Sequence, residues 1–199
     1  MLKADVRLFF GVMGSGKGFL ALHQTRSFKR VMIDDPATVA ENGVGATVCE
    51  RPSELYEALL NKSFRICWRG ALHMEPRVSV EIFSQAAWAA QGVCVMYDEL
   101  DLTCGVRRDI PRFTRRNLHS SRHRDLHVFA VAQSAANLHK NYRRLATRIC
   151  VFNTNEPDDL KYLRGRLRSD LVEQLPTLQE YHVLDFKQEG STVRKSPFS

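Results

Sequence analysis

A glycine-rich stretch near the start of the chain has the residue types and spacing of a phosphate-binding loop. It runs from Gly11 to Gly18 and contains the pattern Gly-x-x-x-x-Gly-Lys, with the lysine at position 17. Glycines permit backbone angles that other residues avoid, so successive N–H groups can point into one cradle. The amino end of the next helix adds positive potential there, and Lys17 supplies a charge for the terminal phosphates. The predicted nucleotide-binding residues are Gly11, Val12, Met13, Gly14, Ser15, Gly16, Lys17, Gly18 and Phe19.

One position departs from the usual form of this motif. The residue after the lysine is normally Ser or Thr, whose hydroxyl binds Mg²⁺, whereas this chain has Gly18. Ser15 lies inside the loop and is not an obvious replacement. Either a distal carboxylate and water hold the metal, or the loop binds nucleotide more weakly.

Two adjacent acids follow a continuous apolar run and have the form of a Walker B motif. Residues 93–97 are predicted to form a buried parallel strand, and Asp98 and Glu99 come directly after it. Consecutive side chains point in different directions at a strand end. Asp98 is therefore predicted to hold Mg²⁺, and Glu99 to activate water as a general base. Many strands end in acids for no catalytic reason, but the phosphate-binding loop upstream favours the catalytic interpretation.

A glutamine ends the next predicted buried strand, which spans residues 127–132. If this strand lies beside the first one, Gln133 can contact the γ-phosphate or the attacking water. The alternative is an amide that only caps the strand.

The most basic stretch lies between these two strands, where seven arginines and no lysine occur between positions 107 and 124. A charge run is usually a solvated face, but arginine is favoured over lysine for phosphate recognition. These side chains are predicted to bind DNA or to contact the nucleotide of a neighbouring subunit as an arginine finger. The predicted DNA-binding residues are Arg107, Arg108, Arg112, Arg115, Arg116, Lys140, Arg143 and Arg144.

Predicted strands alternate with predicted helices along most of the chain, which indicates an α/β fold. We expect a three-layer sandwich around a mostly parallel central sheet. Helices are predicted at 17–28, 53–61, 78–91, 111–121, 135–146 and 157–167. We expect one domain over residues 1–170 and a C-terminal appendage over 171–199. Within the appendage, residues 181–186 and 192–194 are predicted to form a hairpin.

Composition excludes several classes of protein. The 199 residues are 44% hydrophobic, which suits a packed core and argues against disorder. Five cysteines without a C-x-x-C pair favour a reduced intracellular protein with buried thiols. No apolar run approaches 18 residues, so no membrane span is expected. The net charge of +7 favours a polyanionic partner.

The order of these motifs resembles the HerA/FtsK branch of P-loop ATPases, over roughly residues 5–153. The stretches 121–134 and 138–145 resemble the zonular-occludens-toxin-like members from filamentous phages. The chain also resembles the short genome-packaging ATPases of membrane-containing icosahedral viruses. The missing transmembrane segment, which is typical of filamentous-phage assembly proteins, favours the packaging type.

The resemblance implies a P-loop NTPase fold with an additional strand and a catalytic glutamate, of the RecA/FtsK-like type. It implies ATP and Mg²⁺ as ligands, DNA of one or two strands as partner, and a homo-oligomeric ring such as a hexamer. Arg122 stands 11 residues before Gln133, where that branch has a finger acting on the next subunit. Lys17, Glu99, Arg122 and Gln133 would then form the catalytic set.

The expected function is an ATP-hydrolysing DNA translocase that packages a viral genome. Capsid or packaging-vertex proteins would be further partners, in the host cytoplasm or on the virion. The alternatives are a zonular-occludens-toxin-like assembly ATPase, a small P-loop kinase, and a nucleotide-binding regulator that does not hydrolyse.

Overall fold

A computed structural model describes residues 4–36, 45–105, 109–187 and 190–196. Within these residues nine strands form one sheet in the order β3-β4-β2-β5-β6-β1-β7-β8-β9. Strands β1 to β7 run parallel, while β8 and β9 are antiparallel additions at one edge. The strands are β1 (Val6–Phe10), β2 (Arg30–Asp34), β3 (Thr47–Cys49), β4 (Phe64–Trp68), β5 (Cys94–Tyr97), β6 (His127–Ala132), β7 (Arg148–Val151), β8 (His182–Lys187) and β9 (Gly190–Lys195).

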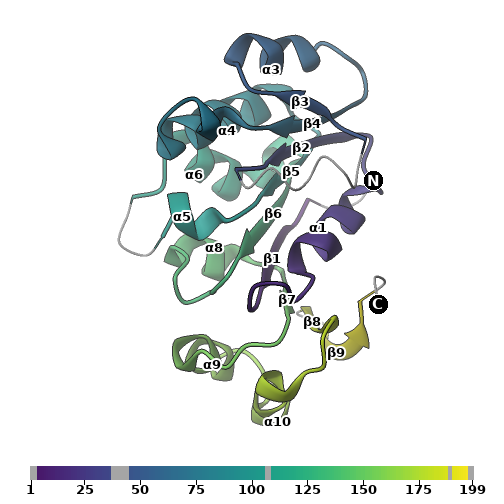
Figure 1. Cartoon of the computed structure of the whole chain (residues 1–199), viewed down its shortest axis with the longest axis vertical. Coiled ribbons are helices and arrows are strands. Elements are labelled where there is room, and N and C mark those ends of the chain that lie inside the picture. Colours follow the sequence, from purple (N-terminus) through teal and green to yellow (C-terminus); the bar gives the residue numbers. More distant parts are fainter. Residues whose placement is uncertain (1–3, 37–44, 106–108, 188–189, 197–199) are drawn as a thin grey trace.

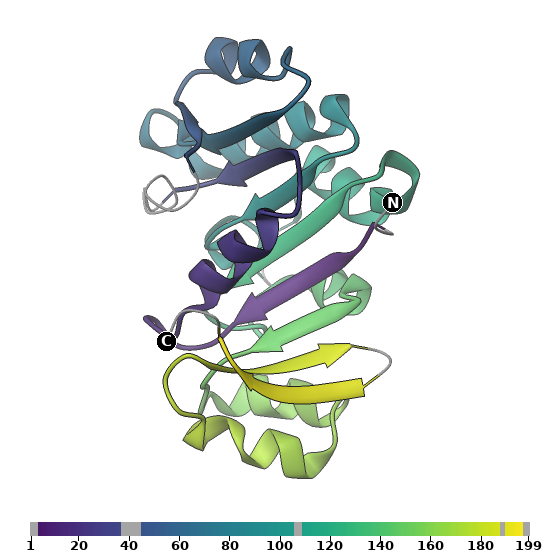
Figure 2. The same ribbon diagram turned by 90° about the vertical axis from the view of Figure 1, so that its right-hand side faces the viewer.

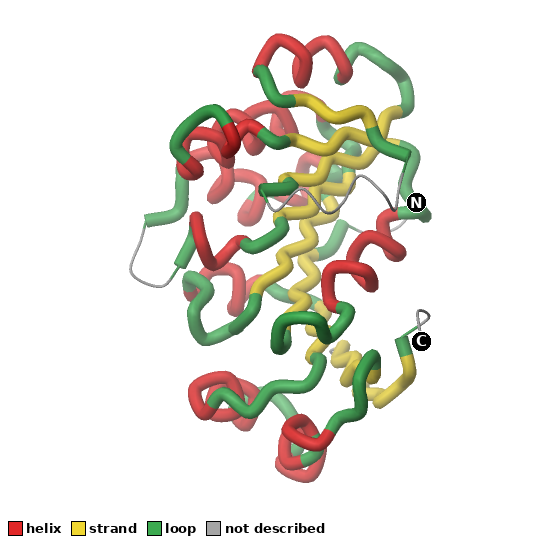
Figure 3. Tube along the Cα trace, viewed as in Figure 1, coloured by secondary structure: helices red, strands yellow, loops and turns green. Residues whose placement is uncertain are grey.

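Helices cover both faces of the sheet, as Figures 1 and 3 show: α1 lies on one face, and α4, α6 and α8 lie on the other. The three-layer α/β prediction is therefore confirmed. The helices are α1 (Lys17–Thr25), α3 (Pro52–Ala58), α4 (Pro76–Ala90), α5 (Leu100–Thr103), α6 (Arg112–His119), α7 (Ser121–Arg124), α8 (Lys140–Leu145), α9 (Pro157–Arg164) and α10 (Ser169–Glu173). In the described part of the chain, no helix has the length and apolar character needed to cross a bilayer.

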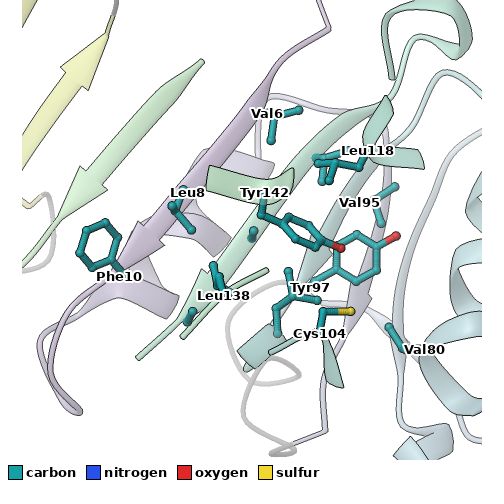
Figure 4. Close-up of a cluster of buried hydrophobic side chains, with 14 of the residues drawn as sticks. Val6, Leu8, Phe10, Val80, Val95, Tyr97, Cys104, Leu118, Leu138 and Tyr142 are labelled. Atoms are coloured by element: carbon teal, nitrogen blue, oxygen red, sulfur yellow. The ribbon is translucent and has the colours of Figure 1, made fainter. Parts of the chain in front are cut away.

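The central strands are buried on both faces because their side chains alternate between two apolar clusters. Phe9 packs on the α1 side, whereas Leu8 and Phe10 pack on the side of the other helices. Figure 4 shows the second cluster, in which the rings of Tyr97 and Tyr142 lie close together. All five cysteines are buried and unpaired, in line with the prediction of inert thiols.

A buried polar network ties α4 and α6 to β5. The Tyr97 hydroxyl lies 3.0 Å from Ser84 Oγ and accepts a 3.0 Å hydrogen bond from Asn117 Nδ2. Ser84 Oγ also lies 2.8 Å from Thr114 Oγ1. Because every partner is buried, loss of one hydrogen bond would leave a desolvated polar group. The network therefore fixes α6 relative to the strand that ends at Asp98.

The end of the chain extends the sheet as a β8–β9 pair, which lies beside β7 in Figure 2. Asp185 of β8 accepts a hydrogen bond from Arg148 Nε at 2.7 Å and one from Arg194 Nε at 3.2 Å. Leu184 belongs to the main hydrophobic cluster. The boundary near residue 170 stays a prediction.

The predicted helix over residues 135–146 is wrong in its first half, because α8 begins only at Lys140. The buried Asp159 carboxylate accepts hydrogen bonds from Ser134 Oγ at 2.8 Å and from the Ala136 N–H at 2.7 Å. These tertiary bonds hold the start of the segment as a loop, which local propensity does not reveal.

Candidate nucleotide-binding site

The glycine-rich loop joins the end of β1 to the start of α1, as the motif predicts. Gly14 and Gly16 have φ angles of 77° and 92°, in the left-handed region that favours glycine. A side chain at Gly11 would place its Cβ only 2.7 Å from Phe152 Cβ. Three of the loop glycines are thus required by backbone angle or by close packing.

The structure brings Lys17, Asp98, Glu99 and Gln133 together at the carboxyl ends of neighbouring strands in the centre of the sheet. They follow or adjoin β1, β5 and β6, which are neighbours in the order β5-β6-β1. Burial lowers the pKa of Lys17, and the nearby carboxylates of Asp98, Asp101 and Glu99 oppose that shift. Lys17 therefore lies within the electrostatic reach of the predicted metal-binding and catalytic acids.

The two predicted catalytic acids differ in environment. Burial raises the pKa of Asp98 to about 6, although the Glu99 N–H donates to its Oδ1 at 3.1 Å. Glu99 has a φ of 47°, a left-handed conformation that is uncommon for such a residue. Backbone strain of this kind concentrates at functional sites, where the surrounding structure enforces it.

Sequence analysis missed a second acidic pair beside Asp98. Asp34 ends β2, the neighbour of β5, and Asp35 follows it. Burial raises the pKa of Asp34 to about 8, with further contributions from Asp98 and Asp35. Asp35 is fully buried and forms an ion pair of 3.1 Å with Arg69 Nη2. The sequence signal was present, because two acids after a buried strand repeat the pattern of Asp98 and Glu99.

The residues present suit a Mg²⁺–nucleotide complex. Carboxylate oxygens are preferred ligands of Mg²⁺, which usually takes one or two of them together with substrate phosphates. Within the described ranges, no group of three or more Asp, Glu, His or Cys side chains could hold a metal. Ser15 Oγ is buried in the loop and has no hydrogen-bond partner among the described residues. This hydroxyl fits a polar ligand bound in the loop.

Arg122 lies at the other end of the strands, near their amino ends. It is exposed on α7 and lines a hollow of about 340 Å³ together with Val6 and Thr147, at the amino ends of β1 and β7. Strand β6 spans six residues, or roughly 20 Å, between Arg122 and Gln133. The structure therefore does not bring Arg122 close to Gln133 or to the other predicted catalytic residues of its own chain.

Five of the predicted DNA-binding residues are exposed on α6 and α8, the two helices that lie on the face of the sheet opposite α1. The exposed members are Arg112, Arg115 and Arg116 on α6, and Lys140 and Arg144 on α8. The two helices are joined where Asn141 Nδ2 lies 3.2 Å from His119 Nε2. Arg143 instead packs over the ring of Tyr162 at 5.4 Å. Arg107 and Arg108 lie outside the described residues.

Aromatic side chains lie against two arginines of this region, Arg116 on α6 and Arg124 on α7. The guanidinium of Arg124 lies 4.3 Å from the ring centre of Trp88, and Arg116 lies 5.3 Å from that of Phe113. The Phe113 N–H donates to both carboxylate oxygens of Glu81, which anchors the start of α6 to α4. The orientation of these arginines is therefore partly set before any partner binds.

No family model matches the sequence, and no curated protein matches it significantly. Solved structures are similar in fold. The genome-packaging NTPase B204 of Sulfolobus turreted icosahedral virus 2, in complex with ATP-gammaS, has a TM-score of 0.77 at 18% identity, covering 98% of this chain and 99% of B204. VirB4 of Thermoanaerobacter pseudethanolicus has a TM-score of 0.69 at 11% identity, covering 98% and 90%.

The N-terminal domain of zonular occludens toxin from Neisseria meningitidis is also similar, with a TM-score of 0.53 at 13% identity, covering 98% of this chain and 96% of that domain. The resemblance noted in the sequence is thus matched by structural neighbours of the same kinds. At these identities the likeness establishes a P-loop NTPase fold.

Proposed function

We propose that the protein is an ATP-hydrolysing motor that moves DNA, and that it packages a viral genome. The observation that carries the proposal is that Lys17, Asp98, Glu99 and Gln133 lie together at the carboxyl ends of neighbouring strands. The fold likeness to a genome-packaging NTPase solved with ATP-gammaS supports the choice of nucleotide and of task.

Each residue of the site has a distinct part in this proposal. The loop N–H groups and Lys17 bind the triphosphate, and Asp98 is the side chain that would hold Mg²⁺. Mg²⁺ supplies positive charge that neutralises the phosphates. Glu99 accepts the proton of the attacking water, and Gln133 orients that water or the γ-phosphate. Gln133 is exposed directly after β6, where it can contact either group.

The basic surface on α6 and α8 is the proposed DNA contact. Burial lowers the pKa of His139 and the nearby charges of Lys140 and Arg115 lower it further, so the two helices share one positive field. A surface of this kind binds the phosphate backbone with little sequence preference, as a translocating motor requires. The network around Tyr97 connects α6 to the strand that carries Asp98.

A subunit of this kind needs a neighbour to complete its site. Arg122 and the glycine-rich loop of the same chain lie at opposite ends of the strands. We therefore propose that Arg122 acts on the nucleotide of the next subunit in a homo-oligomeric ring. Guanidinium groups supplied in this way stabilise charge in the transition state.

The deciding experiment is ATPase activity measured with and without double-stranded and single-stranded DNA. We expect hydrolysis that DNA stimulates and that Lys17→Ala abolishes. Hydrolysis that DNA leaves unchanged, with phosphate transfer to a small molecule, would favour the kinase alternative. Stimulation by single-stranded DNA alone would favour an assembly ATPase of the filamentous-phage type. The similarity in fold to zonular occludens toxin is the reason to test this alternative.

A further inference from the structure

The segment that leads into β8 is bound to the glycine-rich loop through one asparagine. The backbone oxygen of Asn153 accepts a 3.0 Å hydrogen bond from the Val12 N–H of the loop. The Asn153 side chain donates from Nδ2 to the backbone oxygens of Leu178 at 2.9 Å and Pro176 at 3.2 Å. The loop and the segment around residues 176–181 therefore keep a fixed relation.

Tyr181 lies at the end of this segment, with its ring packed against the loop. A Cβ added to Gly16 would lie 2.9 Å from Tyr181 Cδ1 and 3.6 Å from Cε1. The ring therefore occupies the space beside the residue that caps α1. Tyr181 is only partly buried, so the residue keeps surface that a ligand can contact.

The backbone of Tyr181 is strained in order to place the ring there. Its φ is 60°, which is a genuine outlier for a bulky side chain. Hydrogen bonds on both sides hold the conformation: the Ser196 N–H donates to Tyr181 O at 2.7 Å, and the His182 N–H donates to Gln179 O at 3.0 Å. Strain maintained in this way is a frequent property of ligand clamps.

The topology sets the direction in which a nucleotide would lie. Asp98 and Glu99 mark the γ-phosphate end on the β5 side, and β1 lies between β6 and β7. The ribose and base of a nucleotide bound in the loop would therefore extend away from β5, toward β7 and β8. Tyr181 immediately precedes β8 and touches the loop on that side.

We propose that the Tyr181 ring is the stacking platform for the nucleobase, and that Asn153 is the positioning residue that fixes its distance from the phosphates. This inference rests on the proposed ATP-binding function. It assigns recognition of the base to the C-terminal segment, beyond the residues of the phosphate-binding motif. Stacking on an aromatic ring accepts any base and favours the large rings of purines.

The test is equilibrium binding of Mg²⁺–ATPγS and of inorganic tripolyphosphate, measured by calorimetry. Tripolyphosphate occupies the phosphate cradle and has no base. We expect Tyr181→Ala to weaken ATPγS binding about tenfold, the range of one stacked base, and to leave tripolyphosphate binding unchanged. Tyr181→Phe should restore ATPγS binding. Tyr56→Ala, which removes a 40% exposed tyrosine from α3, is the matched control and should change neither.

Each other outcome counts against the inference. Equal losses for both ligands in Tyr181→Ala would make Tyr181 a support of the loop, and unchanged ATPγS affinity would mean that no base stacks there. Wild-type protein that binds tripolyphosphate as tightly as ATPγS would overturn the base site alone. Wild-type protein that binds neither ligand would overturn the proposed function as well.

Discussion

At the scale of single residues, the site combines one partly buried lysine with several partly or fully buried acids. Burial lowers the pKa of Lys17 and raises that of Asp98 to about 6, so both charges are destabilised without a ligand. A triphosphate with Mg²⁺ would supply charges of both signs to these groups. The division of roles between Lys17 and Glu99 can be separated by mutation.

Lys17→Ala and Glu99→Gln should fail in different ways. We expect Lys17→Ala to lose nucleotide affinity, because in the proposed function this lysine contacts phosphate in the ground state. Glu99→Gln should bind ATP normally and hydrolyse it about 10²–10⁴-fold more slowly, the usual contribution of a general base. Binding titrations and single-turnover hydrolysis measure the two effects. Hydrolysis by Glu99→Gln at the wild-type rate would remove Glu99 from the role of base.

Gly18→Ser should restore the hydroxyl that the motif usually provides. A Cβ added at Gly18 would meet nothing within 4 Å, and the residue lies in the first turn of α1, so a serine fits. We expect a lower Mg²⁺ concentration for half-maximal nucleotide binding, because the hydroxyl adds a ligand for the metal. Gly18→Ala is the control for the side chain without oxygen. If Gly18→Ala lowered the required Mg²⁺ concentration as much as Gly18→Ser, the serine hydroxyl would not be the cause.

At the scale of elements, the site depends on strands that are adjacent in the sheet and distant in the sequence. The glycine-rich loop follows β1, and the predicted site residues Asp98, Glu99 and Gln133 follow β5 and β6. The β8–β9 pair adds Tyr181 and is fixed to β7 through the carboxylate of Asp185.

Asp185→Asn should loosen this C-terminal pair in a pH-dependent way. Burial would raise the pKa of Asp185, but hydrogen bonds and charges of Arg148 and Arg194 outweigh burial and lower it below the ordinary 3.8. Its stabilising contribution is thus present above about pH 4 and is lost as the pH falls below that value. We expect a loss of about 2–3 kcal/mol in the free energy of unfolding at pH 7, and a smaller loss at pH 3, where part of the contribution of the ionised carboxylate is gone.

Denaturant unfolding at the two pH values measures this difference. Asp170→Asn is the matched control, because its pairing with Arg168 is exposed and contributes little. An Asp185→Asn effect of the same size at pH 3 and pH 7 would show that charge pairing is not the cause.

At the scale of the whole molecule, the glycine-rich loop and Arg122 lie at opposite ends of the strands: the loop follows the carboxyl end of β1, and Arg122 lies near the amino ends of β1 and β7. Helices α6 and α8, which carry the exposed basic side chains, lie on the face of the sheet away from α1 (Figure 1). A subunit with this layout can present Arg122 to one neighbour and its loop to another.

The basic surface should give DNA affinity that falls steeply with salt. Removing one side chain that binds a phosphate should reduce the slope of log K against log salt by about 0.7–0.9. We expect the triple change Arg112→Ala, Arg115→Ala and Arg116→Ala to reduce the slope by about 2–3 in total. Lys161→Ala with Arg164→Ala, two exposed changes on α9, is the control. An unchanged slope in the triple variant would place the DNA elsewhere.

Arg122→Ala should bind ATP normally and hydrolyse it about 10³–10⁵-fold more slowly, the range of known arginine fingers. Mixing it with Lys17→Ala protein should restore part of the activity, because some interfaces then pair an intact loop with an intact arginine. Hydrolysis assays over a range of protein concentration test this. Activity per subunit that is independent of concentration, with no rescue on mixing, would exclude action between subunits.

Local patterns were sufficient for much of the fold and for the nucleotide motif. Apolar runs that end before Gly11, Asp98 and Gln133 predict parallel strands, because strands buried on both faces read as nearly continuous apolar runs. The order β5-β6-β1 in the structure then brings those strand ends together. The helix start at Lys140 was misplaced, because Asp159 bonds the preceding loop from a distant position.

The sequence by itself determined the α/β class, the glycine-rich loop between a strand and a helix, and the two acids after β5, since each depends on residues that are consecutive in the chain. Only the tertiary structure decided that Asp34 lies beside Asp98, that Tyr181 packs against Gly16, and that α6 and α8 share one basic surface. These neighbours are separated by tens of residues or more. Their proximity depends on strand order and helix packing, which are properties of the whole fold and leave no local pattern in the sequence.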